Sequence, residues 1–222
     1  MADRARRFIL ITIIDYDAGN LHSVRNALAR LGEEGVVTRD EKTILSSDRV
    51  ILPGVGAFGD AMRLLESYGL VDVIHEVARR QIPLIGICLG MQILFEESEE
   101  SPGVKGLGLL KGKIRRIPDQ GGTLKVPHMG WNDLTFPNRG NLFDGIREGS
   151  FVYFVHSYYL KAEDPSIVTA RTQYSVPIDA SVQKGNLFGC QFHPEKSSDV
   201  GLQILKNFLD LSAARSAVYL PR

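Results

Sequence analysis

The first half of the chain alternates between short apolar runs and segments whose apolar residues recur at helical spacing. Phe8–Ile14 lacks polar alternation, as is typical of a parallel strand that is covered on both faces. Asn20–Leu31 carries apolar side chains three or four positions apart, and Gly32 follows it as a helix cap. This half therefore predicts alternating strands and helices. The other strands expected here are Val36–Thr38, Val50–Leu52 and Pro83–Ile87, and the other helices are Phe58–Leu65, Leu70–Arg80 and Leu89–Glu97.

The second half shows short strand-like segments separated by turn residues such as Pro137-Asn138 and Lys184–Asn186. This pattern predicts an antiparallel meander, either added to the edge of the sheet or packed as a side layer. Gly201–Ala214 closes the chain as an amphipathic helix. The strands expected in this half are Ile114–Ile117, Asp133–Phe136, Phe151–Tyr159, Ile167–Thr172, Ala180–Gln183 and Leu187–Phe192.

The order of elements predicts an α/β fold with a mostly parallel central sheet and antiparallel additions in the C-terminal half. A length of 222 residues fits one domain spanning residues 1–222. The arginine-rich first seven residues are expected to form a flexible extension. A signal peptide is disfavoured, because the apolar run that follows is short, stops at Asp15 and has no small-residue cleavage site after it.

Composition excludes several classes of protein. The chain has 26 Lys and Arg and 26 Asp and Glu, so a net charge of zero gives no indication of nucleic-acid or membrane-surface binding. No apolar run reaches the roughly 18 residues of a membrane span. The two cysteines, Cys88 and Cys190, rule out a disulfide scaffold but leave a single bridge open, and a cytoplasmic location is expected. The residue spacing supports neither a metal site nor a nucleotide site, so no cofactor is expected.

The strongest chemical signal is the sequence Gly86-Ile87-Cys88-Leu89-Gly90 between an expected strand and an expected helix. This is a nucleophile elbow with cysteine in the place of serine. The partial positive charge at the helix start favours a thiolate, and the N–H of Leu89 is placed to stabilise an oxyanion. A lone cysteine is usually a small buried apolar residue. The two flanking glycines at a strand–helix junction favour a nucleophile here.

A base for this cysteine is predicted at His193, which ends an expected strand in Phe192-His193-Pro194-Glu195. Pro194 keeps its predecessor extended, and residues two apart in extended chain point the same way. Glu195 can therefore hold one nitrogen of the His193 ring while the other faces the thiol. On its own, His193 could be a surface residue at the end of a strand.

A third signal is the glycine-rich sequence Pro53–Gly59, which follows the strand Val50–Leu52 at the same edge of the sheet. Its glycines let backbone N–H groups converge on a small anion. The chain lacks the lysine-containing sequence of a phosphate-binding loop. An oxyanion loop beside the Cys88 elbow fits better, and an ordinary glycine-rich turn is the alternative.

Together these motifs resemble the class I, or triad, glutamine amidotransferases. The segments at residues 86–92 and 191–195 match the signatures of that family. Within it, the chain resembles the glutaminase subunits of imidazole glycerol phosphate synthases, from histidine biosynthesis. The resemblance implies a flavodoxin-like three-layer sandwich. The segments that carry the closer resemblance are Asp15–Leu21, Pro53–Phe58, Pro127–Asn132 and Phe154–Tyr158.

The resemblance also implies a chemistry. Cys88 would attack the side-chain amide of glutamine, His193 would pass the thiol proton to departing ammonia, and Glu195 would orient His193. The oxyanion would be held by the N–H of Leu89 and by one from Gly54, Val55 or Gly56, with Val55 favoured. In this family that second donor is thought to face away until a partner binds. By motif position, the glutamine substrate would contact Gln92, Glu100, Ser157 and Tyr158. Glu100 also fits a solvated face, because it ends the acidic run Glu96–Glu100.

The implied partner is a separate (β/α)₈ cyclase subunit that forms a heterodimer with this chain and uses its ammonia to make imidazole glycerol phosphate. No such barrel fits within 222 residues. Residues expected to face the cyclase are Tyr153, Lys196 and the Pro127–Asn132 loop, which includes His128, Met129, Trp131 and Asn132. Ordinary core packing is the alternative for His128, Met129 and Trp131.

Three rival functions remain open at this point. The chain could supply ammonia to another synthase, such as the one that makes pyridoxal phosphate, although the His128–Asn132 loop favours the histidine pathway. It could be a cysteine hydrolase or peptidase, which would turn over peptides or esters without a partner. It could also be a non-catalytic scaffold, although a scaffold has no need of Cys88, His193 and Glu195 together.

Overall fold

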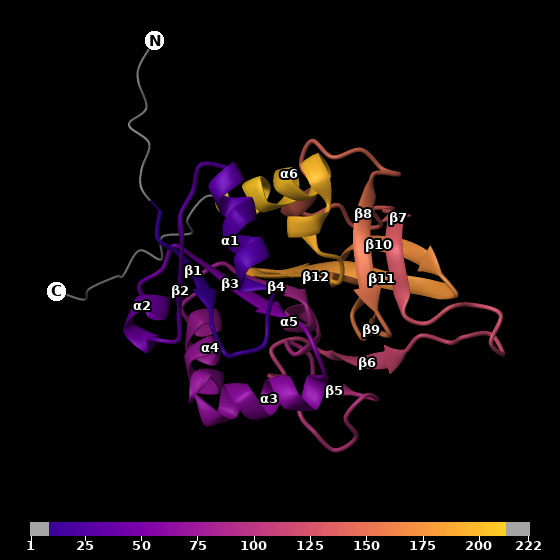
Figure 1. Cartoon of the computed structure of the whole chain (residues 1–222), viewed down its shortest axis with the longest axis horizontal. Helices are drawn as coiled ribbons and strands as arrows, with labels where there is room; N and C mark the ends of the chain where they lie inside the picture. The colour runs from indigo at the N-terminus through magenta and orange to yellow at the C-terminus, as the bar shows by residue number, and fades with distance from the viewer. Residues whose placement is uncertain (1–8, 212–222) are drawn as a thin grey trace, which may run out of the picture.

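The centre of the molecule is a seven-stranded sheet in the order β10-β11-β12-β4-β3-β1-β2 (Figure 1). The computed structural model describes residues 9–211; the expected N-terminal extension and the end of the expected C-terminal helix lie outside them. Neighbouring strands from β12 to β2 are parallel, whereas β10 and β11 are antiparallel additions. The strands are β1 (Ile11–Ile14), β2 (Gly35–Thr38), β3 (Arg49–Gly54), β4 (Leu84–Cys88), β10 (Val168–Tyr174), β11 (Val176–Lys184) and β12 (Leu187–Cys190).

Helices cover both faces of this sheet, which makes three layers. Alternate residues of a strand point to opposite faces, so Val50 and Leu52 pack with α3 and α4, whereas Ile51 packs with α1 and α6. Figure 1 shows α1 and α6 on one side of the sheet and α3 and α4 on the other. The predicted three-layer α/β fold is confirmed. The helices are α1 (Leu21–Arg30), α2 (Glu41–Leu45), α3 (Phe58–Ser67), α4 (Leu70–Arg79), α5 (Leu89–Gln92) and α6 (Ser198–Leu209).

The strands of the second half take both of the arrangements that the sequence left open. Strands β10 and β11 extend the edge of the main sheet, while two smaller sheets pack beside it. One pairs β5, β6 and β9, and the other pairs β7 with β8. The bounds are β5 (Glu97–Ser98), β6 (Gly112–Arg116), β7 (His128–Asp133), β8 (Phe151–His156) and β9 (Tyr158–Ala162), with 3₁₀ turns η1 (Asn141–Phe143), η2 (Pro165–Ile167) and η3 (Pro194–Lys196).

Several predicted boundaries are wrong. The helix expected to reach Glu97 ends at Gln92, because Gly106, Leu107, Gly108 and Leu110 donate their backbone N–H groups to the carbonyls of residues 93–96. The strand expected at Asp133–Phe136 lies earlier, at His128–Asp133, where it pairs with β8. The single strand expected at Phe151–Tyr159 is two strands, because β8 pairs with β7 and β9 pairs with β6.

Helix α2 was not predicted, although Asp40 accepts a hydrogen bond from the N–H of Thr43 at 2.8 Å as an N-cap.

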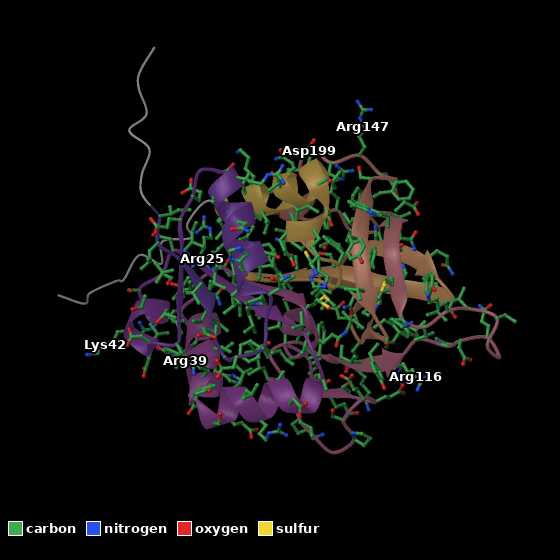
Figure 2. All side chains as sticks on the ribbon, viewed as in Figure 1. Arg25, Arg39, Lys42, Arg116, Arg147 and Asp199 are labelled. Carbon is green, nitrogen blue, oxygen red and sulfur yellow. The ribbon has the colours of Figure 1, made fainter. Side chains whose placement is uncertain are left out.

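Charged side chains project outward from the fold, as Lys42, Arg116 and Arg147 do in Figure 2. Within residues 9–211, no helix is long and apolar enough to cross a membrane.

Candidate active site

The predicted elbow lies at the junction of β4 and α5. Cys88 has φ 55° and ψ −111°, a conformation that costs energy for any residue other than glycine. The side chain is 7% exposed. Gly90 allows this turn, because a Cβ atom there would lie 1.8 Å from the carbonyl oxygen of Leu52 in β3. The strand–turn–helix context expected around Cys88 is confirmed.

Gly90→Ala is therefore expected to lower the free energy of unfolding by about 3 kcal/mol or more, since a backbone atom rather than a mobile side chain blocks the added methyl group. Gly59→Ala is the matched control, because its Cβ would meet the side chain of Ser101 instead. Urea unfolding of both variants measures the difference. Equal stability of the two variants would contradict the packing described here.

The structure brings His193 and Glu195 together beside Cys88. His193 Nδ1 donates to Glu195 Oε1 at 2.8 Å, and both side chains are almost completely buried. Within residues 9–211, His193 Nε2 has no hydrogen-bond partner. Burial, the largest influence, lowers the pKa of His193, but its interactions with Cys88 and Glu195 outweigh it and raise the pKa to about 9. The His193 imidazole therefore holds a proton more readily than a free histidine does, next to the side chain of Cys88.

This pKa predicts a dependence of stability on pH. Because folding raises the pKa of His193 from about 6.5 to about 9, its contribution is fully present below pH 6.5 and is lost as the pH rises through 9. Between pH 6.5 and pH 9, the free energy of unfolding should therefore fall further for the wild type than for His193→Asn. Urea unfolding at pH 6.5, 7.5 and 9 tests this, and parallel pH curves for the two proteins would contradict it.

Two buried glutamines connect to the nucleophile. Gln191 Nε2 donates to Cys88 Sγ at 3.7 Å, and Gln191 Oε1 accepts from Gln92 Nε2 at 2.9 Å. Gln92 Nε2 also donates to the carbonyl of Tyr158 at 2.9 Å, so its Oε1 is left to face a ligand. Sequence reasoning missed Gln191. Its position two residues before His193 in extended chain was the available signal.

The glycine-rich loop after β3 lies on the other side of Cys88. Gly54 pairs with Cys88 across β3 and β4, and Val55 and Gly56 line the cavity in front of the sulfur, as Leu89 does. Val55 is 44% exposed, and Gly56 has φ 99° with nothing within 4 Å of where a Cβ would lie. The tip of this loop therefore has room to rotate its peptides.

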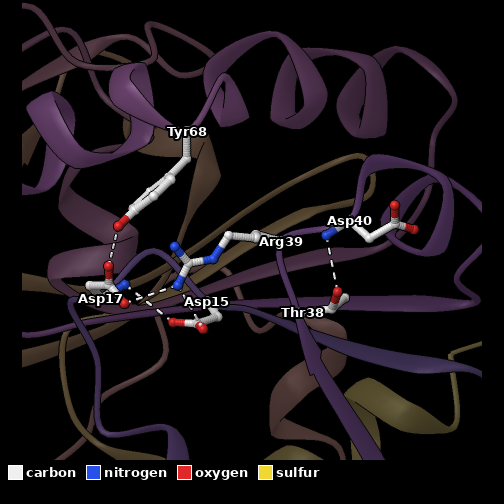
Figure 3. A network of polar contacts seen from close by, with 6 residues as sticks. All are labelled: Asp15, Asp17, Thr38, Arg39, Asp40 and Tyr68. Carbon is white, nitrogen blue, oxygen red and sulfur yellow. Dashed lines mark hydrogen bonds and ion pairs between the residues drawn. The ribbon is translucent and has the colours of Figure 1, made fainter.

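The base of the same loop is held by the β1–α1 connection. The Tyr16 hydroxyl donates to the carbonyl of Pro53 at 2.8 Å, and burial, then the nearby Cys88, raises the pKa of Tyr16. Figure 3 shows how this connection is fixed: Arg39 binds Asp15 and Asp17, each at 2.9 Å. Arg39 also stacks over the ring of Tyr68, whose hydroxyl bonds Asp17. The base of the glycine loop is therefore anchored, whereas Val55 at its tip is exposed.

The cavity in front of Cys88 has a volume of about 340 Å³, within the range of small-molecule sites. Its lining includes all four residues expected to contact substrate: Gln92, Glu100, Ser157 and Tyr158. Glu100 is not simply part of a solvated face, because its Oε2 accepts from the N–H of Phe58 at 2.8 Å at the start of α3. Within residues 9–211, no cluster of three or more His, Cys, Asp and Glu side chains suits a metal ion.

The residues expected to face a partner do not all lie at the surface. Met129 and Trp131 are 59% and 52% exposed, so core packing is excluded for them. Lys196 is exposed, Asn132 is half-buried, and half-buried Tyr153 packs its ring against Trp131. The prediction that His128 faces a partner is wrong: its ring is 3% exposed, because it is stacked between Phe154 and Tyr174.

The second cysteine lies apart from the cavity. Cys190 is fully buried in β12, and burial raises the pKa of its thiol to about 12. Its side chain contacts the hydroxyl of Ser181. Cys190 therefore lacks both the access and the thiolate character that a nucleophile needs.

Known proteins resemble this chain over most of its length. The profile of the family described as "Glutamine amidotransferase class-I" matches residues 12–211. The protein named imidazole glycerol phosphate synthase subunit HisH from Moorella thermoacetica is 55% identical over 201 residues, covering 90% of this chain and 94% of the relative. The HisH subunit of Bacillus cereus strain G9842 is 53% identical, covering 90% and 93%.

Solved structures share the fold at lower identity. A crystal structure titled as a glutamine amidotransferase superposes with a TM-score of 0.70 at 22% identity, covering 90% of this chain and 98% of that one. The structure of PurLQS from Thermotoga maritima gives a TM-score of 0.68 at 22% identity, covering 91% and 98%.

Proposed function

The chain belongs to the class I glutamine amidotransferase family, and from its identity with HisH subunits we infer that it is the glutaminase subunit of an imidazole glycerol phosphate synthase. It releases ammonia from glutamine for histidine biosynthesis. The family match and the identity of more than half of the aligned residues with HisH subunits support this assignment. The observation that carries the chemistry is that Cys88 and His193 line one cavity while Glu195 holds the His193 ring from behind.

The geometry supports a thioester mechanism. His193 Nε2 takes the thiol proton, and Cys88 Sγ attacks the side-chain carbonyl carbon of glutamine to form a tetrahedral intermediate. His193 then gives the proton to the leaving nitrogen, so the C–N bond breaks and ammonia departs. Water, deprotonated by His193, cleaves the γ-glutamyl thioester to glutamate and restores the thiol. Glu195 holds the ring by its Nδ1–H throughout.

Charge on the tetrahedral oxygen needs two donors. The N–H of Leu89, at the start of α5, supplies one. The second comes from the loop tip at Val55, whose N–H belongs to the peptide that joins it to Gly54, a residue with no side chain to oppose rotation of that peptide. Substrate orientation comes from the cavity lining: the side-chain carbonyl of Gln92 accepts a hydrogen bond from a glutamine nitrogen, and Glu100 attracts the α-ammonium group.

The Val55 donor can be tested by removing its N–H. Val55→Pro is expected to lower kcat for glutamine hydrolysis in the complex by roughly 10²–10³-fold, the usual loss for one oxyanion donor. Val55→Ala keeps the N–H and should stay within about threefold of the wild type. Steady-state ammonia release by both variants measures this. Equal kcat values would exclude Val55 as a donor.

The partner that accepts the ammonia is a (β/α)₈ cyclase subunit, bound as a heterodimer. The names of the relatives, which are subunits of a synthase, support a separate partner. Met129, Trp131 and Phe151, which are more than half exposed on β7 and β8, offer the apolar aromatic surface that interface centres favour. Tyr153 packs its ring against Trp131 in this surface, and backbone hydrogen bonds join both Tyr153 and Lys196 to His193.

An isotope experiment tests the function. The chain is mixed with an imidazole glycerol phosphate synthase cyclase, the cyclase substrate, ¹⁵N-amide glutamine and excess unlabelled ammonium. The ¹⁵N label is expected in the imidazole ring undiluted, because ammonia passes directly between the subunits. Dilution by the ammonium pool would overturn direct delivery. Activity only with a pyridoxal phosphate synthase subunit would assign the chain to that pathway instead.

A further inference from the structure

Two buried histidines lie outside the proposed triad and take no part in the thioester mechanism. His128 in β7 and His156 in β8 are opposite one another in the strand register. His128 Nδ1 lies 3.0 Å from His156 Nε2, and His156 Nδ1 lies 2.8 Å from the carbonyl oxygen of Tyr158. Their exposed fractions are only 3% and 6%.

The contacts fix which nitrogen of each ring carries the proton. A carbonyl oxygen only accepts, so His156 must donate to Tyr158 from Nδ1. In the neutral ring, His156 Nε2 is then an acceptor, and His128 must donate to it from Nδ1. This leaves His128 Nε2 as an acceptor, and the amide nitrogen of Asn132 lies 3.4 Å from it. Donors and acceptors therefore follow one direction, from Asn132 to Tyr158.

Further hydrogen bonds lead from Tyr158 to the Cys88 sulfur. The Tyr158 carbonyl also accepts from Gln92 Nε2 at 2.9 Å. That nitrogen donates to Gln191 Oε1, and Gln191 Nε2 donates to Cys88 Sγ. The His128–His156 pair thus fixes the carbonyl from which the two glutamines reach the sulfur.

At its other end, this series of hydrogen bonds begins at Asn132, next to the surface proposed for the partner. Asn132 also donates to the carbonyl of Gln173, and β7 carries the exposed side chains of Met129 and Trp131 beside it. The ring of His128 stacks on Phe154 at 4.7 Å and on Tyr174 at 4.0 Å between ring centres. A shift of β7 on docking must therefore move His128 together with its hydrogen bond.

We propose that His128 and His156 are positioning residues that transmit docking at the β7–β8 surface to the Cys88 thiol through Tyr158, Gln92 and Gln191. The proposal rests on the proposed function, since it needs a partner on that surface. Burial lowers the pKa of His128 to about 4 and, with smaller effects of its neighbours, that of His156 to about 3. Both rings are therefore neutral at pH 7, as the donor order requires.

The ring protons can be observed directly in the wild-type chain. Long-range ¹H–¹⁵N correlation spectra at pH 7 are expected to show both histidines protonated on Nδ1 and unprotonated on Nε2. This is the less common neutral form of histidine in water, so it is not expected by default. A proton on Nε2 of either ring would overturn the proposed direction of the contacts.

Two substitutions of His128 separate hydrogen bonding from packing. His128→Asn keeps a donor near the position of Nδ1 but loses the stacked ring, whereas His128→Phe keeps the ring and loses the donor. The quantity compared is the increase in glutaminase kcat that the cyclase causes. If His128 transmits docking, this increase falls roughly tenfold or more in His128→Phe, as expected for loss of a buried hydrogen bond. In His128→Asn, which keeps a donor, the increase recovers. Tyr174→Phe, which keeps the stacked ring, is the control.

The order of the two variants decides the outcome. Activation that is as strong in His128→Phe as in His128→Asn, or stronger, would overturn the proposal, and so would wild-type activation in both. If the wild-type chain itself were not activated by the cyclase, the proposed function would fail instead. The spectra above test the hydrogen-bond order without any partner.

Discussion

Cys88→Ala is expected to abolish synthesis from glutamine while synthesis from free ammonium continues at the wild-type rate. Alanine lacks the sulfur that must attack the amide, and the loss should exceed about 10⁴-fold, as for removal of a nucleophile in a triad. The methyl side chain fits the elbow, because Cys88 already holds its positive φ angle. The measurement is product formation by the complex with each nitrogen source.

The matched control is Cys190→Ala, which changes the other cysteine in the buried strand β12. It should keep glutamine-dependent synthesis within about threefold of the wild type, apart from a loss of stability from the small cavity it creates. If Cys88→Ala also lost the ammonium-driven reaction, the chain would do more than supply ammonia. Retained use of glutamine by Cys88→Ala would exclude Cys88 as the nucleophile.

Glu195→Gln should lower kcat for glutamine hydrolysis by roughly 10³–10⁴-fold, the effect of replacing a triad carboxylate by an amide. The uncharged side chain no longer stabilises the imidazolium, and its amide nitrogen can turn toward Nδ1 and force the wrong tautomer on His193. The pKa of His193 should fall from about 9 as well, because Glu195 helps to raise it. Ammonia release and an NMR titration of His193 measure the two effects.

Glu163→Gln, on the exposed loop after β9, is the control for loss of one negative charge and should behave as the wild type. A fall in kcat with no change in the pKa of His193 would mean that Glu195 orients the His193 ring without stabilising its positive charge. An unchanged kcat would remove Glu195 from the catalytic group.

The local pattern of the sequence was sufficient for the elements of the parallel sheet and for the elbow. Strands such as β4 are buried on both faces, so they appear as unbroken apolar runs. A side chain at Gly86 would collide with the backbone of Gly90, and one at Gly90 would collide with the neighbouring strand β3. The spacing of these two glycines is visible in the sequence. Cys88, His193 and Glu195 were proposed because each stands in a short local motif, and the structure brings the two motifs to one side of the sheet.

What the sequence did not reveal depends on contacts between distant segments. The end of α5 at Gln92 is decided by the backbone of residues 106–110, which takes over the carbonyls that would continue the helix. The burial of His128 is decided by Phe154 and Tyr174, far along the chain. The spacing from His193 indicated the side of the chain on which Gln191 lies, but its contact with Cys88 forms only when β12 lies beside β4.

The most direct test of the central claim is to identify the residue that glutamine modifies. The complex is treated with an electrophilic diazoketone analogue of glutamine, digested and analysed by mass spectrometry. A single adduct on Cys88 is predicted, with Cys190 unmodified and with labelling strongly reduced in His193→Asn. An adduct on any other residue, or inactivation that leaves Cys88 unlabelled, would contradict the assignment of Cys88 as the nucleophile.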